Sequence, residues 1–186
     1  VRNSIVGQIV YLDTPGIHRP LHRMNVRMVD LALQCMGQAD VVCAVADGSE
    51  PIGGGDRYLA KRLKRVHAPV VLALNKMDVM EKQALLPLIQ TWSGLATFAD
   101  ILPVSALTGE NVDHLEPVLA RHLPDGEPLY PPDYVTDQPE RVFVGETVRE
   151  KLLQHTRDEP PFTSAVMVDR IEDADDRKVM RLYCTI

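Results

Sequence analysis

The sequence predicts an α/β fold with a doubly wound parallel sheet, and three observations lead to this prediction. Apolar runs at residues 39–47, 70–74 and 101–104 have the length and composition of buried parallel strands. Stretches with apolar residues at helical spacing alternate with these runs. Two of the runs end directly in polar residues, and an open α/β sheet binds its ligands at the carboxyl ends of its strands. We therefore expect a ligand site along one edge of the sheet.

The composition limits the kinds of protein that this chain can be. Its 186 residues, 45% of them apolar, are enough for one full domain or one and a half. The net charge of −6 gives no general electrostatic attraction to nucleic acid or anionic lipid, so such a partner needs a local patch. Cys35, Cys43 and Cys184 stand far apart, which argues against a disulfide framework and a zinc site.

The motif Asn75-Lys76-x-Asp78 follows the apolar run 70–74 and is the most specific functional signal. The Asp78 carboxylate can accept hydrogen bonds from both the ring N–H and the exocyclic amine of guanine, whereas adenine offers no such pair of donors. Asn75 can steady the loop, and the stem of Lys76 can cover the base. A site built to receive these hydrogen bonds rejects a base that lacks them by ~10⁴-fold or more. A polar loop that matches by chance is the alternative at this point.

Two further motifs gain their meaning from their positions in the chain. Asp13-Thr14-Pro15-Gly16 begins at the last residue of the predicted strand 8–13, where a carboxylate can hold Mg²⁺ through water and a glycine N–H can approach a terminal phosphate. About one chance match to such a short pattern is expected in a chain of this length. Ser105-Ala106-Leu107 ends the run 101–104, where backbone N–H groups can donate to the O6 atom of guanine.

The start of the chain predicts two short strands, residues 1–7 and 8–13. Two antiparallel strands need at least a two-residue turn between them, and the junction of Gly7 with Gln8 offers none. We therefore expect residues to be missing from the sequence at this junction.

Apolar spacing predicts the helices of the first domain. A helix that starts at Leu21 and is closed by Gly37 carries one apolar stripe, formed by Met24, Met28, Leu31 and Cys35. Residues 49–56 are predicted as a loop, and Asn111 as the N-cap of a helix. Other helices are marked by Leu59, Leu63 and Val66, by Leu85, Leu88, Ile89 and Trp92, and by Val112, Leu115 and Leu119. His18 and His22 stand four residues apart, but Pro20 disfavours a helix that could make them a metal site.

A proline-rich stretch separates this domain from a second, smaller one. Five prolines between residues 124 and 139 indicate a linker. After it we expect a helix with Val144, Val148 and Leu152 in register, a strand at 164–171, an acidic turn at 172–176 and a last strand at 179–186. One face of the last strand carries Met180, Leu182, Cys184 and Ile186.

The order of these segments resembles the bacterial Era family of GTPases along essentially the whole chain. The resemblance rests on DTPGIH, NKMD and SALTG, on the hinge PPDYVTDQPERV and on the helix GETVREKLL. It implies a P-loop NTPase-type GTPase domain at 1–124, a hinge at 125–137 and, at 138–186, the N-terminal half of an α+β type II KH domain. In that family the KH domain binds the 3′ end of 16S ribosomal RNA during small-subunit assembly.

The resemblance also implies roles for individual residues. Asn75, Lys76 and Asp78 would bind the base of GTP or GDP. Asp13 would serve Mg²⁺ through water, and Gly16 would contact the γ-phosphate. Ile17 stands where many GTPases carry a water-orienting Gln, so slow hydrolysis is expected. The base would be supported by Ser105, Ala106 and Leu107.

The chain departs from the family pattern at both ends. The P-loop G-x-x-x-x-G-K-[ST] is absent, so we expect these 186 residues to be part of a longer chain and inactive alone. The Gly-x-x-Gly loop that clamps RNA in KH domains would follow Ile186, and residues 137–186 hold eight Lys or Arg against eleven Asp or Glu. We therefore expect residues 1–186 not to discriminate among RNA sequences.

Several alternatives and expectations about partners accompany this prediction. A related GTPase of tRNA modification or large-subunit assembly would share the first domain, and a scaffold that has lost hydrolysis would share the base motif. The expected partners are 16S ribosomal RNA and the 30S subunit, without zinc and without DNA. The expected location is the cytoplasm, with peripheral contact to the inner face of the cell membrane left open.

Overall fold

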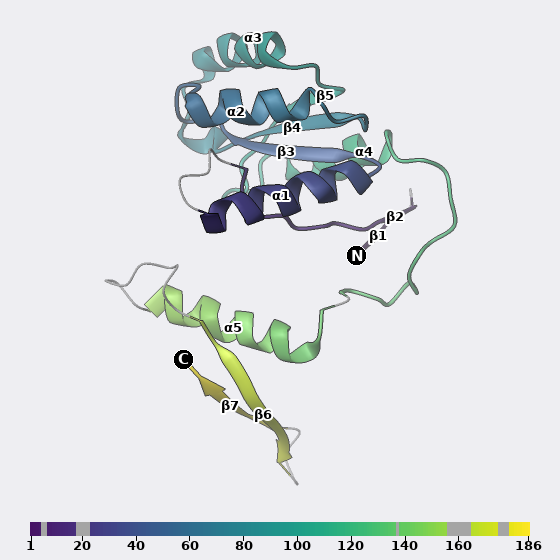
Figure 1. The fold of residues 1–186 in the computed structure, drawn as a ribbon, viewed down its shortest axis with the longest axis vertical. Coiled ribbons are helices and arrows are strands. Elements are labelled where there is room, and N and C mark those ends of the chain that lie inside the picture. Colours follow the sequence, from purple (N-terminus) through teal and green to yellow (C-terminus); the bar gives the residue numbers. More distant parts are fainter. Residues whose placement is uncertain (5–6, 18–22, 137, 156–164, 175–178) are drawn as a thin grey trace. The chain divides into compact units, whose positions relative to one another are not determined.

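A computed structural model describes residues 1–4, 7–17, 23–136, 138–155, 165–174 and 179–186 of the chain. It divides into two compact units, residues 1–132 and 133–186 (Figure 1). The division falls inside the segment 125–137 that the sequence indicates as a hinge.

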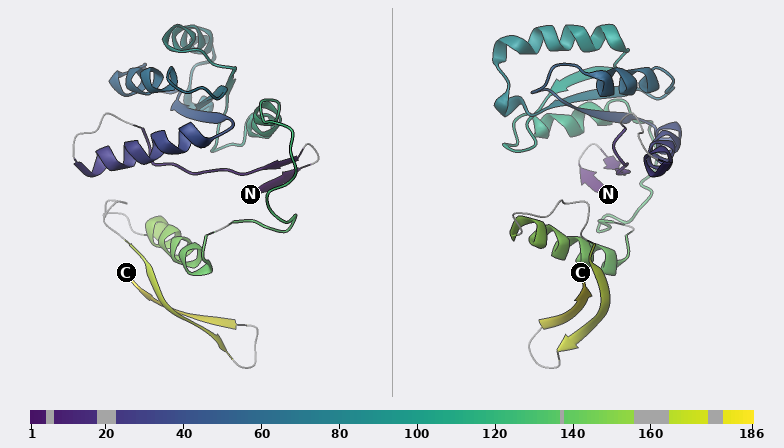
Figure 2. Two further views of the ribbon diagram at one scale, coloured as in Figure 1. Left: turned by 45° about the vertical axis from the view of Figure 1, so that its right-hand side comes forward. Right: turned by 60° about the vertical axis from the view of Figure 1, so that its left-hand side comes forward.

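The first unit contains a parallel three-stranded sheet in the order β3-β4-β5, which confirms the predicted α/β class. Helices α2 and α3 lie on one side of this sheet and α4 lies on the other (Figures 1 and 2). The strands are β3 (Val42–Asp47), β4 (Val70–Asn75) and β5 (Asp100–Pro103). The helices are α1 (Arg23–Gln38), α2 (Gly54–Leu63), α3 (Leu85–Leu95) and α4 (Val112–Ala120), with 3₁₀ turns η1 (Met77–Val79) and η2 (Lys82–Ala84).

The central strand β4 is buried along its apolar part because it has a hydrogen-bonded neighbour at each edge and helices over its faces. Residues 70–74 are all buried, which explains why this strand has a continuous apolar sequence instead of an alternating one. One hydrophobic cluster joins the sheet to Ala60 and Leu63 of α2, Trp92 of α3 and Met36 of α1. Trp92 is fully buried and meets the ring of Phe98 edge-on, at 6.1 Å between centroids.

The two strands at the start of the chain are shorter than predicted. β1 (Arg2–Ser4) pairs antiparallel with β2 (Gly7–Ile9), and Gly7 and Gln8 lie within the same strand. Residues 5 and 6 connect the strands and lie outside the described residues. Gly7 adopts φ 134°, a backbone conformation that suits glycine alone. β2 ends at Ile9 because the described part of the chain offers residues 10–13 no strand to pair with.

The predicted apolar stripe of α1 is wrong for this helix. Met28 and Leu31 are 42% and 52% exposed, whereas Val29, Ala32 and Met36 are buried. Both sets have helical spacing, so periodicity alone could not choose between them. The helix also continues through Gly37 to Gln38. Met24 lies outside the described side chains, and His18, Pro20, Leu21 and His22 lie outside the described residues.

The starts of α2, α4 and β3 refine the predictions made for them. Helix α2 begins at Gly54, inside the loop predicted at 49–56, because the Asp56 carboxylate accepts a hydrogen bond from the Gly53 N–H at 2.8 Å. Asn111 is the N-cap residue of α4, as predicted, but its φ is 59° and its side chain makes no capping hydrogen bond; its amide donates to the Pro103 carbonyl at 3.0 Å. Strand β3 begins at Val42, three residues after the predicted start.

The second unit consists of α5 (Glu140–His155) followed by the antiparallel strands β6 (Met167–Ala174) and β7 (Val179–Thr185). Gly145 is buried where α5 meets β6, and a Cβ atom there would lie 3.2 Å from the Val166 carbonyl oxygen. Strand β6 extends to Ala174, through part of the predicted acidic turn, because residues 172–174 pair with β7. Among the described residues, no helix in either unit is long and apolar enough to cross a membrane.

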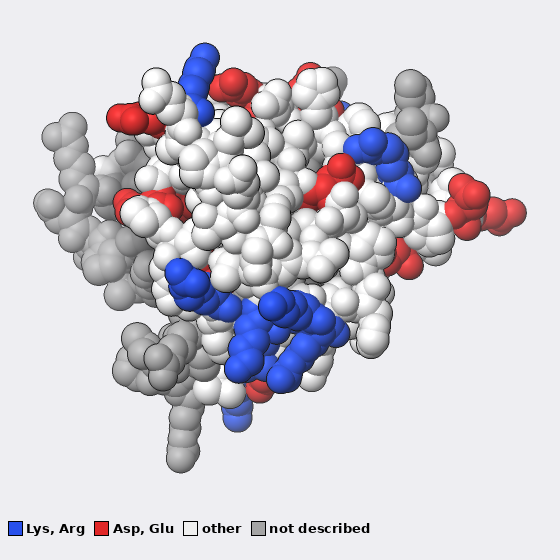
Figure 3. Space-filling model, turned by 90° about the horizontal axis from the view of Figure 1, so that it is seen from above, with Lys and Arg blue, Asp and Glu red and all other residues white. Residues whose placement is uncertain are grey.

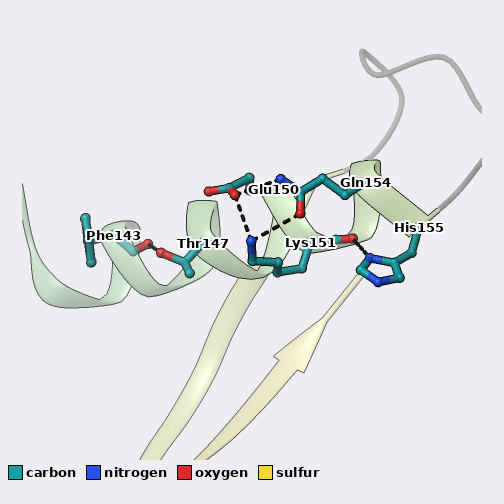
Figure 4. A network of polar contacts seen from close by, with 6 residues as sticks. All are labelled: Phe143, Thr147, Glu150, Lys151, Gln154 and His155. Atoms are coloured by element: carbon teal, nitrogen blue, oxygen red, sulfur yellow. Dashed lines mark hydrogen bonds and ion pairs between the residues drawn. The ribbon is translucent and has the colours of Figure 1, made fainter. Parts of the chain in front are cut away.

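Polar contacts run along the exposed side of α5 (Figure 4). The Lys151 ammonium lies 3.0 Å from the Glu150 carboxylate and 3.1 Å from the Gln154 amide oxygen. The hydrogen bond from Lys151 lowers the pKa of the Glu150 carboxyl from its ordinary value. These side chains are exposed, so the network stabilises the helix locally and offers no enclosed site.

The burial of Trp92 predicts a large effect on stability. Trp92→Ala should lower the free energy of unfolding by about 3–5 kcal/mol, because it leaves a cavity in the cluster between α2, α3 and the sheet. Leu86→Ala on the same helix should change it by less than about 0.5 kcal/mol, since Leu86 is 69% exposed. Chemical denaturation of both variants checks this, and equal losses would contradict the core described above.

Candidate functional site

Three loops meet at the carboxyl ends of the parallel strands β3, β4 and β5. The strands are parallel, and their register pairs Asp47 with Asn75 and Leu74 with Pro103. The residues that follow these strands are therefore neighbours in space although they are far apart in the sequence. They form the loops 47–49, 75–78 and 105–111.

The loop after β4 is fixed by its own backbone and by the loop after β5. Lys76 adopts φ 68° and ψ 35°, the left-handed conformation, which turns the chain sharply into the 3₁₀ turn η1. The Met77 N–H donates to the Val104 carbonyl at 3.2 Å. The Asn75 side-chain oxygen accepts a hydrogen bond from the Ala106 N–H at 2.9 Å. Asn75 thus ties two of the loops together.

Asp78 and Ser105 form a second link between the same two loops. The Ser105 hydroxyl donates to one oxygen of the Asp78 carboxylate at 2.5 Å and accepts from the Thr108 N–H at 3.2 Å. Ser105 is fully buried, whereas Asp78 is exposed. Among the described residues, the second Asp78 oxygen has no hydrogen-bond partner. The carboxylate is therefore held by one oxygen and presents the other to solvent.

Lys76 joins the loop after β3 through Asp47, a residue that the sequence analysis did not single out. The Lys76 ammonium lies 2.5 Å from one Asp47 oxygen. The other oxygen accepts from the Ser49 N–H at 2.9 Å and from the Ser49 hydroxyl at 2.5 Å. A polar residue at the end of a strand beside Asn75 was the available signal, but the neighbouring strand could not be identified from sequence alone. Asp47 thus sets the direction of the Lys76 side chain.

Gly48 allows the first and second loops to approach closely. Its N–H donates to the Asn75 carbonyl at 2.8 Å, and a Cβ atom at this position would lie 2.9 Å from the same oxygen. A side chain there would push the loop after β3 away from Asn75. The contact explains why a glycine follows Asp47.

Within the described residues, the D-x-x-G segment makes no hydrogen bond or ion pair with these loops. Asp13 and Gly16 are exposed and lie in an extended segment beyond the end of β2, not directly at a strand end as predicted. Ile17 is half-buried and packs against the main hydrophobic cluster. Across the described ranges, no hydrogen bond or ion pair connects Asp13 or Gly16 with the loops after β4 and β5.

The remaining predicted residues of the third loop are at the surface. Ala106 and Leu107 are exposed, the latter by 85%, and the Ala106 N–H is already engaged by Asn75. In the part of the chain that the structure describes, the Leu107 N–H has no partner and remains available to a ligand. No group of three or more His, Cys, Asp or Glu residues within that part could hold a metal ion.

The contact between Lys76 and Asp47 has a measurable consequence. The ammonium of Lys76 and, next, the hydroxyl of Ser49 lower the pKa of Asp47 from 3.8 to about 2. The contact therefore favours the folded loop above pH 3.8, and this contribution is lost as the pH falls towards 2. Lys76→Met should move the pKa of Asp47 towards 3.8, while Lys82→Met should leave it unchanged. Carboxyl-carbon NMR titration measures both, and an unchanged Asp47 titration in Lys76→Met would rule out the contact.

Comparisons with known proteins agree with this arrangement. The family model of the elongation factor Tu GTP binding domain matches residues 7–125. Era from Aquifex aeolicus, solved with GDP and AlF4⁻, is 34% identical with a TM-score of 0.81, over 92% of this chain and 59% of its own. Era in complex with MgGDPNP and nucleotides 1506–1542 of 16S ribosomal RNA is 35% identical with a TM-score of 0.78, over 89% of this chain and 57% of its own.

The chain spans 59% and 57% of the lengths of the two Era structures. The family match covers more than half of the chain, and the Era match includes both of its units. The chain belongs to the GTPases that share the GTP binding domain of elongation factor Tu, and within them it is an Era-like GTPase.

Proposed function

We propose that this chain binds GTP and GDP at the site formed by the three loops that follow β3, β4 and β5. The protein it belongs to then hydrolyses GTP slowly, binds 16S ribosomal RNA and assists assembly of the small ribosomal subunit. The observation that carries the nucleotide assignment is the pair of links between the second and third loops, Asn75 to Ala106 and Asp78 to Ser105. They hold an exposed carboxylate in a fixed position without a ligand.

The geometry supports recognition of guanine through Asp78. Ser105 holds one carboxylate oxygen, and the carboxylate can accept hydrogen bonds from the ring N–H and the exocyclic amine of the base. The Ala106 N–H is engaged by Asn75, so the Leu107 N–H becomes our proposed donor to the O6 atom. Asp47 holds the Lys76 ammonium, which directs the aliphatic stem of Lys76 along one side of the base position.

In the proposed site, the segment 13–17 contacts the phosphates of the nucleotide and their Mg²⁺ ion. Asp13 is exposed and has no partner within the described residues, which suits Mg²⁺, a cation commonly bound by one or two carboxylates together with water and substrate phosphates. Asp13 would hold Mg²⁺ through water, and the bound ion would neutralise charge on the phosphates. Gly16 offers a backbone N–H for the γ-phosphate without a side chain in the way.

Slow hydrolysis is expected from the environment of Ile17. Its side chain has no hydrogen-bonding atom and packs against the hydrophobic cluster, so it cannot orient an attacking water. Intrinsic turnover is then on the order of a few per hour, as for GTPases that await a partner.

The second unit supports the RNA part of the proposal. Helix α5 followed by β6 and β7 is the helix-strand-strand order expected for the N-terminal half of a type II KH domain. A similar Era structure contains a fragment of 16S ribosomal RNA. We accordingly propose the 16S RNA of the small subunit as partner and the cytoplasm as location.

Exchange of the Asp78 carboxylate tests the nucleotide assignment. Asp78→Asn places an amide donor opposite the guanine amine, so the affinity of the full-length natural protein for GTP should fall by roughly 2–4 kcal/mol. Xanthosine triphosphate carries an acceptor at that position and should bind the variant better than GTP does.

Calorimetric titration with both nucleotides measures this switch. Asp113→Asn, an exposed carboxylate in the first turn of α4, is the matched control and should bind GTP as the parent does. Unchanged GTP affinity in Asp78→Asn would refute the proposed base site.

A further inference from the structure

Exposed basic side chains follow one another along helix α2 and the turn after it. Arg57 and Lys61 lie four residues apart on the helix, Lys64 is its C-cap and Arg65 lies in the turn that follows, and all four are exposed. Residues four apart share one side of a helix, as Arg57 and Lys61 do here. The opposite side packs into the core through Ala60 and Leu63. We call the set Arg57, Lys61, Lys64 and Arg65 the α2 basic stripe.

The fold leaves the charges of the α2 basic stripe unpaired. In the described ranges of the chain, none of its four members takes part in an ion pair or a side-chain hydrogen bond. The neighbouring Arg62 differs, because it donates to the Tyr58 hydroxyl at 2.8 Å and lies 4.9 Å from the centre of that ring. A structural role thus accounts for Arg62 and for none of the four cations beside it.

The concentration of charge stands out against the rest of the chain. The protein has a net charge of −6, and residues 137–186 carry an excess of acidic groups. Figure 3, which views the molecule from above Figure 1, shows one group of neighbouring Lys and Arg side chains near the lower margin of this face, while its other charged side chains are scattered. An acidic protein that meets a polyanion needs such a local patch.

We propose that the α2 basic stripe is a contact surface for the phosphate backbone of RNA, independent of base sequence. From Arg57 to the end of α2 at Leu63 the helix rises about 9 Å, and Lys64 and Arg65 extend the row into the following turn, so the stripe is long enough to meet more than one phosphate of a strand. Backbone contacts of this kind position a protein on a nucleic acid and carry no sequence information.

The shape of the stripe favours RNA over a lipid surface or an acidic protein. A helix that lies on a membrane inserts its apolar face among the lipids, but the apolar face of α2 is buried in the core. Protein interfaces are depleted in Lys, whereas flexible Lys and Arg side chains suit mobile phosphates.

This inference rests on the proposed function, because that function brings the protein to ribosomal RNA. The two can fail separately. The proposed function requires preference for one RNA sequence, whereas the α2 basic stripe contributes equally to every sequence.

The test removes two charges from the stripe in the full-length natural protein. Lys61→Gln combined with Lys64→Gln should weaken binding of a single-stranded 16S 3′-end oligonucleotide and of a scrambled one by the same factor, roughly tenfold at 0.1 M salt. The slope of log affinity against log salt should fall by roughly 1.5 for both RNAs. Lys61→Arg with Lys64→Arg should restore parental binding. Fluorescence anisotropy across a series of salt concentrations gives all of these quantities.

The control removes the same number of charges elsewhere. Arg27→Gln on α1 combined with Lys82→Gln in η2 should lower the salt slope by less than half as much, although the net charge changes equally. Equal losses in the two double variants, or no loss in the α2 variant, would overturn the stripe as a contact surface. Parental binding that does not distinguish the two oligonucleotides would contradict the proposed function instead, and would leave the stripe supported if the α2 variant still weakens both.

A sedimentation assay separates RNA from a lipid surface. Vesicles with one third anionic phospholipid should not sediment the parent more than the α2 variant at 0.1 M salt. Loss of vesicle binding in the α2 variant together with unchanged RNA binding would assign the stripe to membranes and overturn the proposal.

Discussion

The burial of β4 between two parallel neighbours is the constraint on which the nucleotide site depends. Residues 70–74 are buried, and β4 pairs in parallel with β3 on one side and β5 on the other. Because the strands are parallel, the chain leaves the sheet at the same end, the carboxyl end, after each of them. Asp47, Asn75 and the residues after Pro103 are thereby brought together from distant parts of the sequence. The apolar packing that stabilises the first unit thus also fixes the positions of the polar loops, and a change in strand register would separate them.

The loops are organised before any ligand arrives. Lys76 has a left-handed backbone conformation, and Gly48 allows close contact with the Asn75 carbonyl. The fully buried Ser105 holds the Asp78 carboxylate by a hydrogen bond. Side chains held in this way lose little conformational freedom when a base binds, and a preorganised site keeps more of its interaction energy as affinity. The ion pair between Lys76 and Asp47 lies at the surface, so its main effect is to direct the Lys76 stem.

Much of this arrangement could be predicted because strong signals coincide. A continuous apolar run that ends in Asn75 predicts both a buried strand and a site at its end, and α3 follows from the spacing around Trp92. The sequence pattern gave a wrong prediction where two different arrangements of the helix fit it equally well. Helix α1 has apolar residues at helical spacing on two faces, so periodicity could not choose the buried one. The role of Asp47 was missed because it depends on the neighbouring strand β4, which the sequence does not identify. The start of α2 was missed because one carboxylate, Asp56, accepts a hydrogen bond from Gly53 and lets the helix begin within a run of glycines.

The central claim is that Asp78 recognises both donors of the guanine base, and comparison of GDP with inosine diphosphate and ADP tests it most directly. Inosine diphosphate keeps the ring N–H but lacks the exocyclic amine, so its affinity should be lower than that of GDP by roughly 10- to 100-fold, the effect of one hydrogen bond to a charged acceptor. ADP lacks both donors and should bind ~10⁴-fold or more weakly than GDP. Titration of the full-length natural protein with the three nucleotides would contradict the claim if inosine diphosphate or ADP bound as tightly as GDP.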